Sequence, residues 1–161
     1  ISAEQPDTVS FRRILVATDF AESAERALGC AVQLARHHGA ELILLHVYMD
    51  LPAYPEITAG QVEAIYEEQR RWIEDALERR ARAARAEGLL ARARLETGPA
   101  ASTIAQTPAE EHVDLIAVGT HGRSGLDRLI VGSVAERVVR LASCPVLVVK
   151  TPEKAARADG A

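Results

Sequence analysis

Short apolar runs alternate along this chain with longer segments in which apolar residues recur every three or four positions. Most of the runs are apolar at successive positions, which is typical of strands buried on both faces. Strands of this kind that alternate with helices indicate a parallel sheet covered by helices on both faces. We therefore predict an α/β fold with a doubly wound five-stranded parallel sheet. The predicted strands are Arg13–Thr18, Leu42–Val47, Ala91–Glu96, Leu115–Val118 and Val146–Val149.

The segments between these strands carry helix start and stop signals. The first predicted helix has an apolar stripe from Ala24 to Ala35 and a C-terminal stop at Gly39. Residues 58–61, Thr-Ala-Gly-Gln, have the form of a capping box and begin a long helix that ends near Gly88. A third helix follows Gly98-Pro99, where the later Pro108 is expected to break or kink it, and a fourth begins at Ser133.

The pattern within the strands predicts their order. Ala91–Glu96 alternates apolar and charged residues, which indicates a half-exposed edge strand. With the first strand central, the order 3-2-1-4-5 follows, and Val146–Val149 forms the other edge. Because an unprotected edge is rarely uniformly apolar, we expect a homodimer through Val146–Val149. The alternative is that the residues after Lys150 cover this edge.

Composition excludes several classes of protein. The 161 residues suit one domain, predicted over residues 11–150 with flexible tails at 1–10 and 151–161. A net charge of −4 and an aromatic content of 4% argue against a nucleic-acid-binding surface. No apolar run reaches membrane-spanning length, and the first ten residues lack the features of a secretory signal.

The two cysteines have no spacing typical of a disulfide or metal site. Cys30 falls on the apolar side of a predicted helix, and Cys144 precedes Pro145 at the start of a strand. We interpret both as buried small hydrophobic residues, which suits a reducing cytoplasm.

A glycine-containing segment carries the main functional signal. The strand Leu115–Val118 leads into Gly119 and Gly122, and Gly132-Ser133 then opens a helix. Glycines allow a ligand to approach the backbone, and a helix N-terminus favours an anion. The segment therefore predicts a phosphate site.

Other residues of the site follow from the strand order. Ligands of doubly wound sheets bind beyond the carboxyl ends of the strands where the order reverses, here between the first and fourth strands. Asp19 would then face Gly119 and suit a ribose hydroxyl or an adenine amino group, or would instead cap the following helix. Val47 offers backbone groups to a base. Ser133 is expected to bind phosphate or to form a capping box with Glu136, and the two roles are compatible in different ligand states.

Basic side chains near the glycines have two interpretations. Arg123 and Arg128 either screen phosphate charge or are simply solvated. His121 lacks an evident orienting acid, so we do not expect it to act as a catalytic base.

The segment does not match other phosphate-binding motifs. No Lys-Ser or Lys-Thr follows its last glycine, as a Walker A loop requires. The segment also differs from the dinucleotide-binding fingerprint, because it follows the fourth strand rather than the first. A receiver domain fits poorly, because the third strand ends in Glu96-Thr97 rather than an aspartate and the first strand lacks a paired carboxylate for a metal ion.

The chain resembles the universal stress protein family at these residues. The family motif G-x2-G-x9-G-S/T is complete as Gly119-x2-Gly122-x9-Gly132-Ser133. The segments Ile-Leu-Val-Ala-Thr-Asp, Leu-Leu-His-Val and Ser-Cys-Pro-Val-Leu-Val-Val are also similar, so the resemblance covers residues 13–150.

This resemblance implies an adenine nucleotide site, chiefly for ATP, and dimers formed by the last strand. Ala17, where many members have proline, and Asp19 would line the sugar, and the backbone of Val47 would meet adenine. Gly119 and Gly122 would admit the ribose and phosphates. The residues expected at the triphosphate are Gly132, Ser133 and Val134.

We therefore expect a cytoplasmic, dimeric, ATP-binding regulator or sensor of the stress response. Mg²⁺ or Mn²⁺ would be held mainly by the phosphates, because no carboxylate cluster is evident. One alternative is a slow or partner-dependent ATPase, for which Arg123 offers charge but no convincing base is present. The other alternative is a nucleotide-free dimerisation scaffold in which the glycines form only a tight turn.

Overall fold

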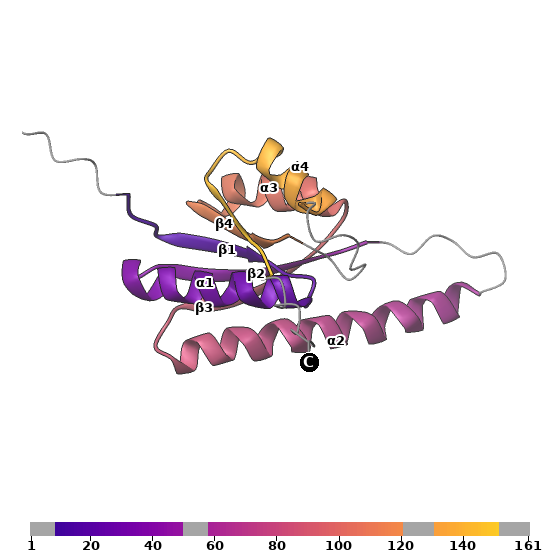
Figure 1. Cartoon of the computed structure of the whole chain (residues 1–161). Coiled ribbons are helices and arrows are strands. Elements are labelled where there is room, and N and C mark those ends of the chain that lie inside the picture. The colour runs from indigo at the N-terminus through magenta and orange to yellow at the C-terminus, as the bar shows by residue number, and fades with distance from the viewer. Residues whose placement is uncertain (1–8, 50–57, 121–130, 152–161) are drawn as a thin grey trace, which may run out of the picture.

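A computed structural model of the chain describes residues 9–49, 58–120 and 131–151 (Figure 1). Strands and helices alternate, as the sequence pattern predicts. The elements are β1 (Arg13–Ala17), α1 (Glu22–His38), β2 (Glu41–Tyr48), α2 (Ala59–Ala86), β3 (Ala91–Thr97), α3 (Ala100–Glu111), β4 (Leu115–Gly119), α4 (Ser133–Leu141) and β5 (Val146–Val149).

The five strands form one parallel sheet in the order β3-β2-β1-β4-β5, which confirms the predicted order. The central strand β1 pairs with β2 on one side and β4 on the other, with Ile14 opposite both Leu42 and Leu115. The strand order therefore reverses between β1 and β4. Their carboxyl ends lie side by side, with Ala17 opposite Val118 and Gly119 one residue further along β4.

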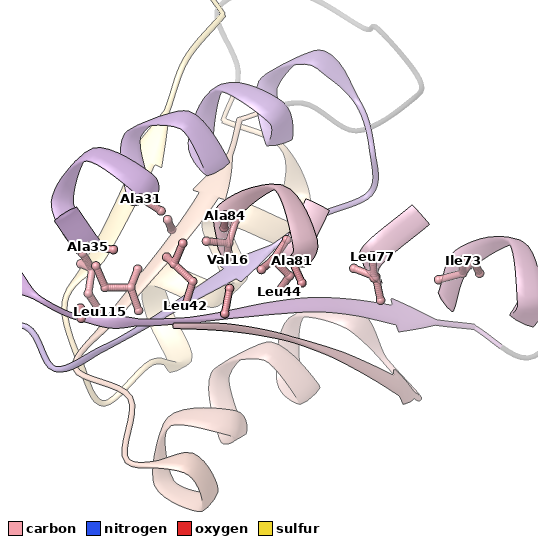
Figure 2. Packing of buried hydrophobic residues seen from close by; sticks show 14 residues of the cluster. Val16, Ala31, Ala35, Leu42, Leu44, Ile73, Leu77, Ala81, Ala84 and Leu115 are labelled. Atoms are coloured by element: carbon pink, nitrogen blue, oxygen red, sulfur yellow. The ribbon is translucent and has the colours of Figure 1, made fainter. Parts of the chain in front are cut away.

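Alternate residues of each strand supply two cores. Val16, Leu44 and their neighbours pack beneath α1 and α2 on one face of the sheet, and Figure 2 shows this cluster. Leu15 and Ile43 point to the other face and pack beneath α3 and α4. Because both faces are covered, the central strands carry apolar residues at successive positions, as expected for parallel strands.

Two helix boundaries form as the sequence predicts. Gly39 ends α1 in the left-handed conformation, with φ of 69°, which a glycine adopts without a steric penalty. Thr58 and Gln61 form the predicted capping box at the start of α2. The helix then runs to Ala86, close to the predicted end.

The expected break at Pro108 is absent. Helix α3 continues past Pro108 to Glu111 and ends at His112, which adopts a left-handed conformation. Pro108 lies in the last turn, where it removes only one backbone hydrogen bond before the helix ends. The local cost of the proline is therefore confined to the end of the helix.

The predicted burial of Cys30 is wrong. Its side chain is exposed on α1, because the buried stripe of this helix runs through the alanines that flank it. Cys144 is half-buried against the core beneath α3 and α4. Burial raises the pKa of the Cys144 thiol, and the carboxylate of Asp114 adds to the shift, so the thiol stays protonated.

The two edges of the sheet differ in charge. On β3, Arg92 pairs with Glu41 and Glu111, and Arg94 pairs with Glu96 and with both glutamates at the end of α3. These charges protect the edge against pairing with another strand. At the other edge, Val146–Val149 is uniformly apolar and half-buried.

In the part of the chain that the structure describes, no helix combines the length and apolar character needed to cross a bilayer.

Candidate functional site

A pocket of about 300 Å³ lies at the carboxyl ends of β1, β2 and β4, beside the start of α4. It brings together seven of the nine residues predicted for the site. These are Ala17, Asp19, Val47, Gly119, Gly132, Ser133 and Val134. The other two, Gly122 and Arg123, lie outside the described residues, as do His121 and Arg128.

A tight turn after β1 holds Asp19 at the pocket. The amide of Phe20 donates to Thr18 Oγ1 over 3.0 Å, and the amide of Ala21 donates to Asp19 Oδ1 over 3.0 Å. Ala21, and not Asp19, is the N-cap of α1, so the alternative role of Asp19 as the cap is wrong. Its carboxylate is instead fixed by the amide of the capping residue, two positions further along the chain.

The same turn contains an unusual backbone conformation. Phe20 has φ of 65°, in the left-handed region that a bulky residue rarely adopts. Such conformations persist only where the surrounding contacts impose them. Here the Phe20 ring stacks on the His46 ring, with centroids 5.1 Å apart.

A hydrogen bond from the His46 side chain connects the end of β2 to this turn. The Nδ1 atom of His46 lies 2.8 Å from the carbonyl oxygen of Thr18. Because a carbonyl oxygen only accepts, Nδ1 carries the proton and donates this bond. The amide of Thr18 in turn donates to the carbonyl of Leu45 over 2.9 Å. These bonds fix the backbone of Val47 beside Asp19.

Gly119 is required by packing as well as by any ligand. A Cβ atom at this position would lie 2.5 Å from the carbonyl carbon of Ser23 and 2.7 Å from the amide nitrogen of Ala24. Backbone atoms of a helix are unable to move aside as a flexible side chain would. The absence of a side chain therefore lets the end of β4 approach the first turn of α1.

The start of α4 is joined to the end of β4. The amide of Gly132 donates to the carbonyl of Thr120 over 2.5 Å, and the amide of Thr120 donates to the carbonyl of Val149 over 3.0 Å. The first and last parts of the glycine motif therefore meet at one edge of the pocket, although twelve positions separate Thr120 from Gly132 in the sequence.

The predicted capping box at Ser133 is wrong. Gly132 is the N-cap, Ser133 is the first helical residue, and the amide of Glu136 donates to the carbonyl of Gly132 over 3.0 Å. No side chain caps this helix among the described residues. Ser133 and Val134 are exposed and line the pocket, so this end of the helix is suited to an anion.

The pocket has opposite electrostatic character at its two ends. Asp19 and His46 are the only ionisable side chains among the described residues that line it. The carboxylate lies at the β1 end, and the positive end of the α4 dipole lies at the other. A ligand with hydroxyl or amino donors at one end and an anionic group at the other matches this arrangement.

Sequence reasoning missed several lining residues. Thr18, His46 and Thr120 adjoin predicted residues, and the rule that carboxyl ends meet at one edge would have found them. Ala100 and Ile104 line the pocket from the first turns of α3, a helix that no motif connects to the site.

Comparisons with known proteins agree on one family. A sequence model of the universal stress protein family matches residues 10–150. The chain is 33% identical over 145 residues to a universal stress protein of Methanocaldococcus jannaschii, a match that covers 89% of this chain and 85% of the relative.

Solved structures give the same result. The universal stress protein UspA from Lactobacillus plantarum is similar with a TM-score of 0.79 and 25% identity, covering 88% of this chain and 99% of that one. A universal stress protein in complex with cAMP is similar with a TM-score of 0.64 and 25% identity, covering 89% of this chain and all of that one (100%).

Proposed function

Because the chain belongs to the universal stress protein family, we propose that it binds an adenine nucleotide, chiefly ATP, in the pocket between β1, β4 and α4. The observation that carries this proposal is the convergence of seven predicted residues on one pocket that opens onto an uncapped helix N-terminus. The protein then acts as a dimeric, cytoplasmic regulator or sensor of the stress response.

The polarity of the pocket supports a defined orientation of the nucleotide. Asp19 accepts hydrogen bonds from a ribose hydroxyl or from the adenine amino group, and the backbone of Val47 meets the base. The phosphates bind the amides of Ser133 and Val134 and the Ser133 hydroxyl, where the helix dipole favours negative charge. The similar protein in complex with cAMP supports an adenine nucleotide as the class of ligand.

A divalent cation would accompany the phosphates and balance their charge. The described residues contain no group of three or more histidine, cysteine or carboxylate side chains that could hold a metal ion. We propose that Mg²⁺ or Mn²⁺ is bound mainly through the nucleotide, as is common for ions that retain several waters.

The proposed dimer forms through β5. The carbonyl groups of Pro145 and Val149 point toward β4, where they accept hydrogen bonds from the amides of Ile116 and Thr120. In a parallel strand the N–H and C=O groups of successive residues point to opposite sides, so the N–H and C=O groups of Val146 and Val148 point away from β4. An apolar strand with such groups on its outer side suits pairing with a second copy of the chain.

The two other functions receive less support. A slow ATPase needs a base for the attacking water. The only ionisable side chains among the described lining residues, Asp19 and His46, lie at the ends of β1 and β2, whereas the phosphates are proposed to bind at the start of α4. A nucleotide-free scaffold is favoured by one observation, the packing requirement at Gly119, but this requirement leaves the uncapped start of α4 unexplained.

Calorimetric titration tests the proposed ligand class. ATP with Mg²⁺, AMP, cAMP and GTP are titrated separately into protein freed of bound nucleotide. We expect saturable binding of adenine nucleotides, tightest for ATP, and at least about tenfold weaker binding of GTP. Steady release of phosphate would favour the ATPase, and an absence of binding by folded protein would favour the scaffold.

A further inference from the structure

A second pocket, of about 550 Å³, adjoins the first at the turn after β1. It lies between that turn, the end of β2 and the exposed first half of α2, on the sheet face that α1 and α2 cover. Asp19 and His46 line both pockets. The described residues that line the second pocket are Asp19, Phe20, His46, Tyr48, Glu68, Gln69, Trp72 and Ile73.

Aromatic rings form much of its wall. The Trp72 ring meets the Phe20 ring edge to face, with centroids 5.4 Å apart, and Tyr48 meets Tyr66 in the same way at 5.7 Å. Trp72 remains 51% exposed, although it is the only tryptophan of the chain and lies within an ordered helix. A large, open aromatic surface beside a cavity is a common feature of binding sites.

This aromatic cluster already attracts one cation. The guanidinium carbon of Arg80 lies 4.8 Å from the centroid of the Phe20 ring, while its Nε atom pairs with Glu25 at 2.7 Å. The contact is a cation–π interaction, in which the negative face of the ring attracts positive charge. The electrostatic character of the cluster is therefore favourable to cations.

Charge selects between the possible ligands. Asp19 and Glu68 are carboxylates, and no lysine or arginine lines this pocket among the described residues. An anion would meet two like charges, whereas a cation would meet two opposite charges and aromatic rings. The first pocket differs, because its phosphate end has the amides of α4 and no carboxylate.

We propose that the second pocket binds an organic ammonium ion, with its alkylated nitrogen against Tyr48 and Trp72 and its charge balanced by Glu68. Weakly hydrated ammonium groups gain most from aromatic surroundings, since they lose little solvation when they leave water. The volume of the pocket leaves room for apolar substituents on the nitrogen.

Trp72 fluorescence provides a direct test, because this single tryptophan lies in the pocket wall. Choline is titrated into nucleotide-free protein, and its neutral isostere neohexyl alcohol, in which carbon replaces nitrogen, is titrated in parallel. We expect a saturable change in emission with choline and at least about tenfold weaker binding of the alcohol. Equal responses to both compounds, or none to choline, would overturn the proposal.

Substitutions on α2 and β2 test whether choline binds in the second pocket. Glu68→Gln should weaken choline binding about three- to tenfold, and Tyr48→Leu by a similar factor. The matched control is Glu63→Gln, which removes the same charge from an exposed position of the same helix outside the pocket. Equal weakening by Glu63→Gln and Glu68→Gln would contradict binding in this pocket. Circular dichroism checks that each variant is folded.

The same titrations separate this proposal from the nucleotide proposal. Choline binding is measured without nucleotide, so it stands or fails independently of ATP. If both ligands bind, their opposite charges on the two sides of Asp19 predict that choline tightens ATP binding and ATP tightens choline binding by the same factor. Choline binding without any ATP binding would refute the proposed function and leave the cation site supported.

Discussion

The amide of Gly132 donates a hydrogen bond to the carbonyl of Thr120, and this bond joins the N-terminus of α4 to the residue that follows β4. The bond uses the Gly132 amide, and Glu136 donates the first hydrogen bond within the helix, so the amides of Ser133, Val134 and Ala135 remain at its start for a ligand. The helix N-terminus is thus held at the sheet edge where Asp19 lies.

Ser133 should contribute to nucleotide binding and not to helix stability. Its hydroxyl caps nothing among the described residues, so Ser133→Ala is expected to change the free energy of unfolding by less than about 0.5 kcal/mol. ATP affinity should fall about three- to tenfold, through loss of one hydrogen bond to phosphate. Calorimetry and urea denaturation measure the two effects.

Thr58→Ala is the comparison for Ser133→Ala, because Thr58 does cap a helix. It should cost about 1 kcal/mol of stability and leave ATP affinity unchanged. If Ser133→Ala destabilises the fold as much as Thr58→Ala does, the Ser133 hydroxyl has a structural role that our assignment excludes.

Gly119→Ala should destabilise the fold even without nucleotide. The added Cβ would lie 2.5 Å from the Ser23 carbonyl carbon, so β4 and α1 would have to separate. We expect a loss of about 2 kcal/mol in the free energy of unfolding, measured by urea denaturation. Gly29→Ala on the exposed side of α1 adds the same atom in open space and should be neutral or stabilising. Equal stability of the two variants would show that the close approach is absent.

The ion-pair network at the β3 edge predicts a pH dependence of stability. The hydrogen bond from Arg92 lowers the pKa of Glu111 below its usual value, although desolvation opposes the shift. A lowered pKa in the folded state favours the ionised form, so Glu111 stabilises the fold above its unfolded pKa. This stabilisation disappears as the pH falls through the folded pKa.

Glu111→Gln should therefore lower the free energy of unfolding by about 1 kcal/mol at neutral pH. The difference from the parent protein should begin to shrink below the unfolded pKa of glutamate, about 4.3, and vanish only in stronger acid, below the lowered folded pKa of Glu111. Chemical denaturation over a pH series measures this difference in the free energy of unfolding. A difference that persists unchanged in acid would mean that the effect does not come from the charge of Glu111.

Val148→Pro tests the proposed dimer. Proline removes the backbone N–H that points away from β4, while the bonds of Pro145 and Val149 to β4 remain. We expect the parent protein to sediment as a dimer and the variant as a folded monomer. A variant that stays dimeric would place the interface elsewhere.

The apolar pattern was sufficient to predict the strands, their order and most helix boundaries, because burial on both faces of a parallel sheet imposes continuous apolar runs. The strand order also predicted that Asp19 and Gly119 lie near each other, and both residues line one pocket. The capping box predicted at Ser133 is wrong because Gly132 and Ser133 each have a plausible capping residue type, and only the backbone decides between them.

Contacts between distant residues were beyond sequence reasoning. Nothing local to Phe20 predicts a φ of 65°, because this conformation depends on His46 and the rings around it. The need for glycine at position 119 similarly comes from the position of α1, nearly a hundred residues earlier. Pro108 was misjudged because the pattern did not show that the helix ends one turn later.

The central claim is that phosphate binds at the start of α4, and a pair of glycine variants tests it most directly. Gly132 lines the pocket and has φ of −54°, which valine can adopt, so Gly132→Val adds a side chain at a lining position without requiring a left-handed backbone. Gly29→Val makes the same change on an exposed helix face with open space around it. We predict that calorimetric titration with ATP and Mg²⁺ shows micromolar binding to the parent protein and to Gly29→Val, and at least about tenfold weaker binding to folded Gly132→Val. Equal affinity of all three proteins would contradict the account.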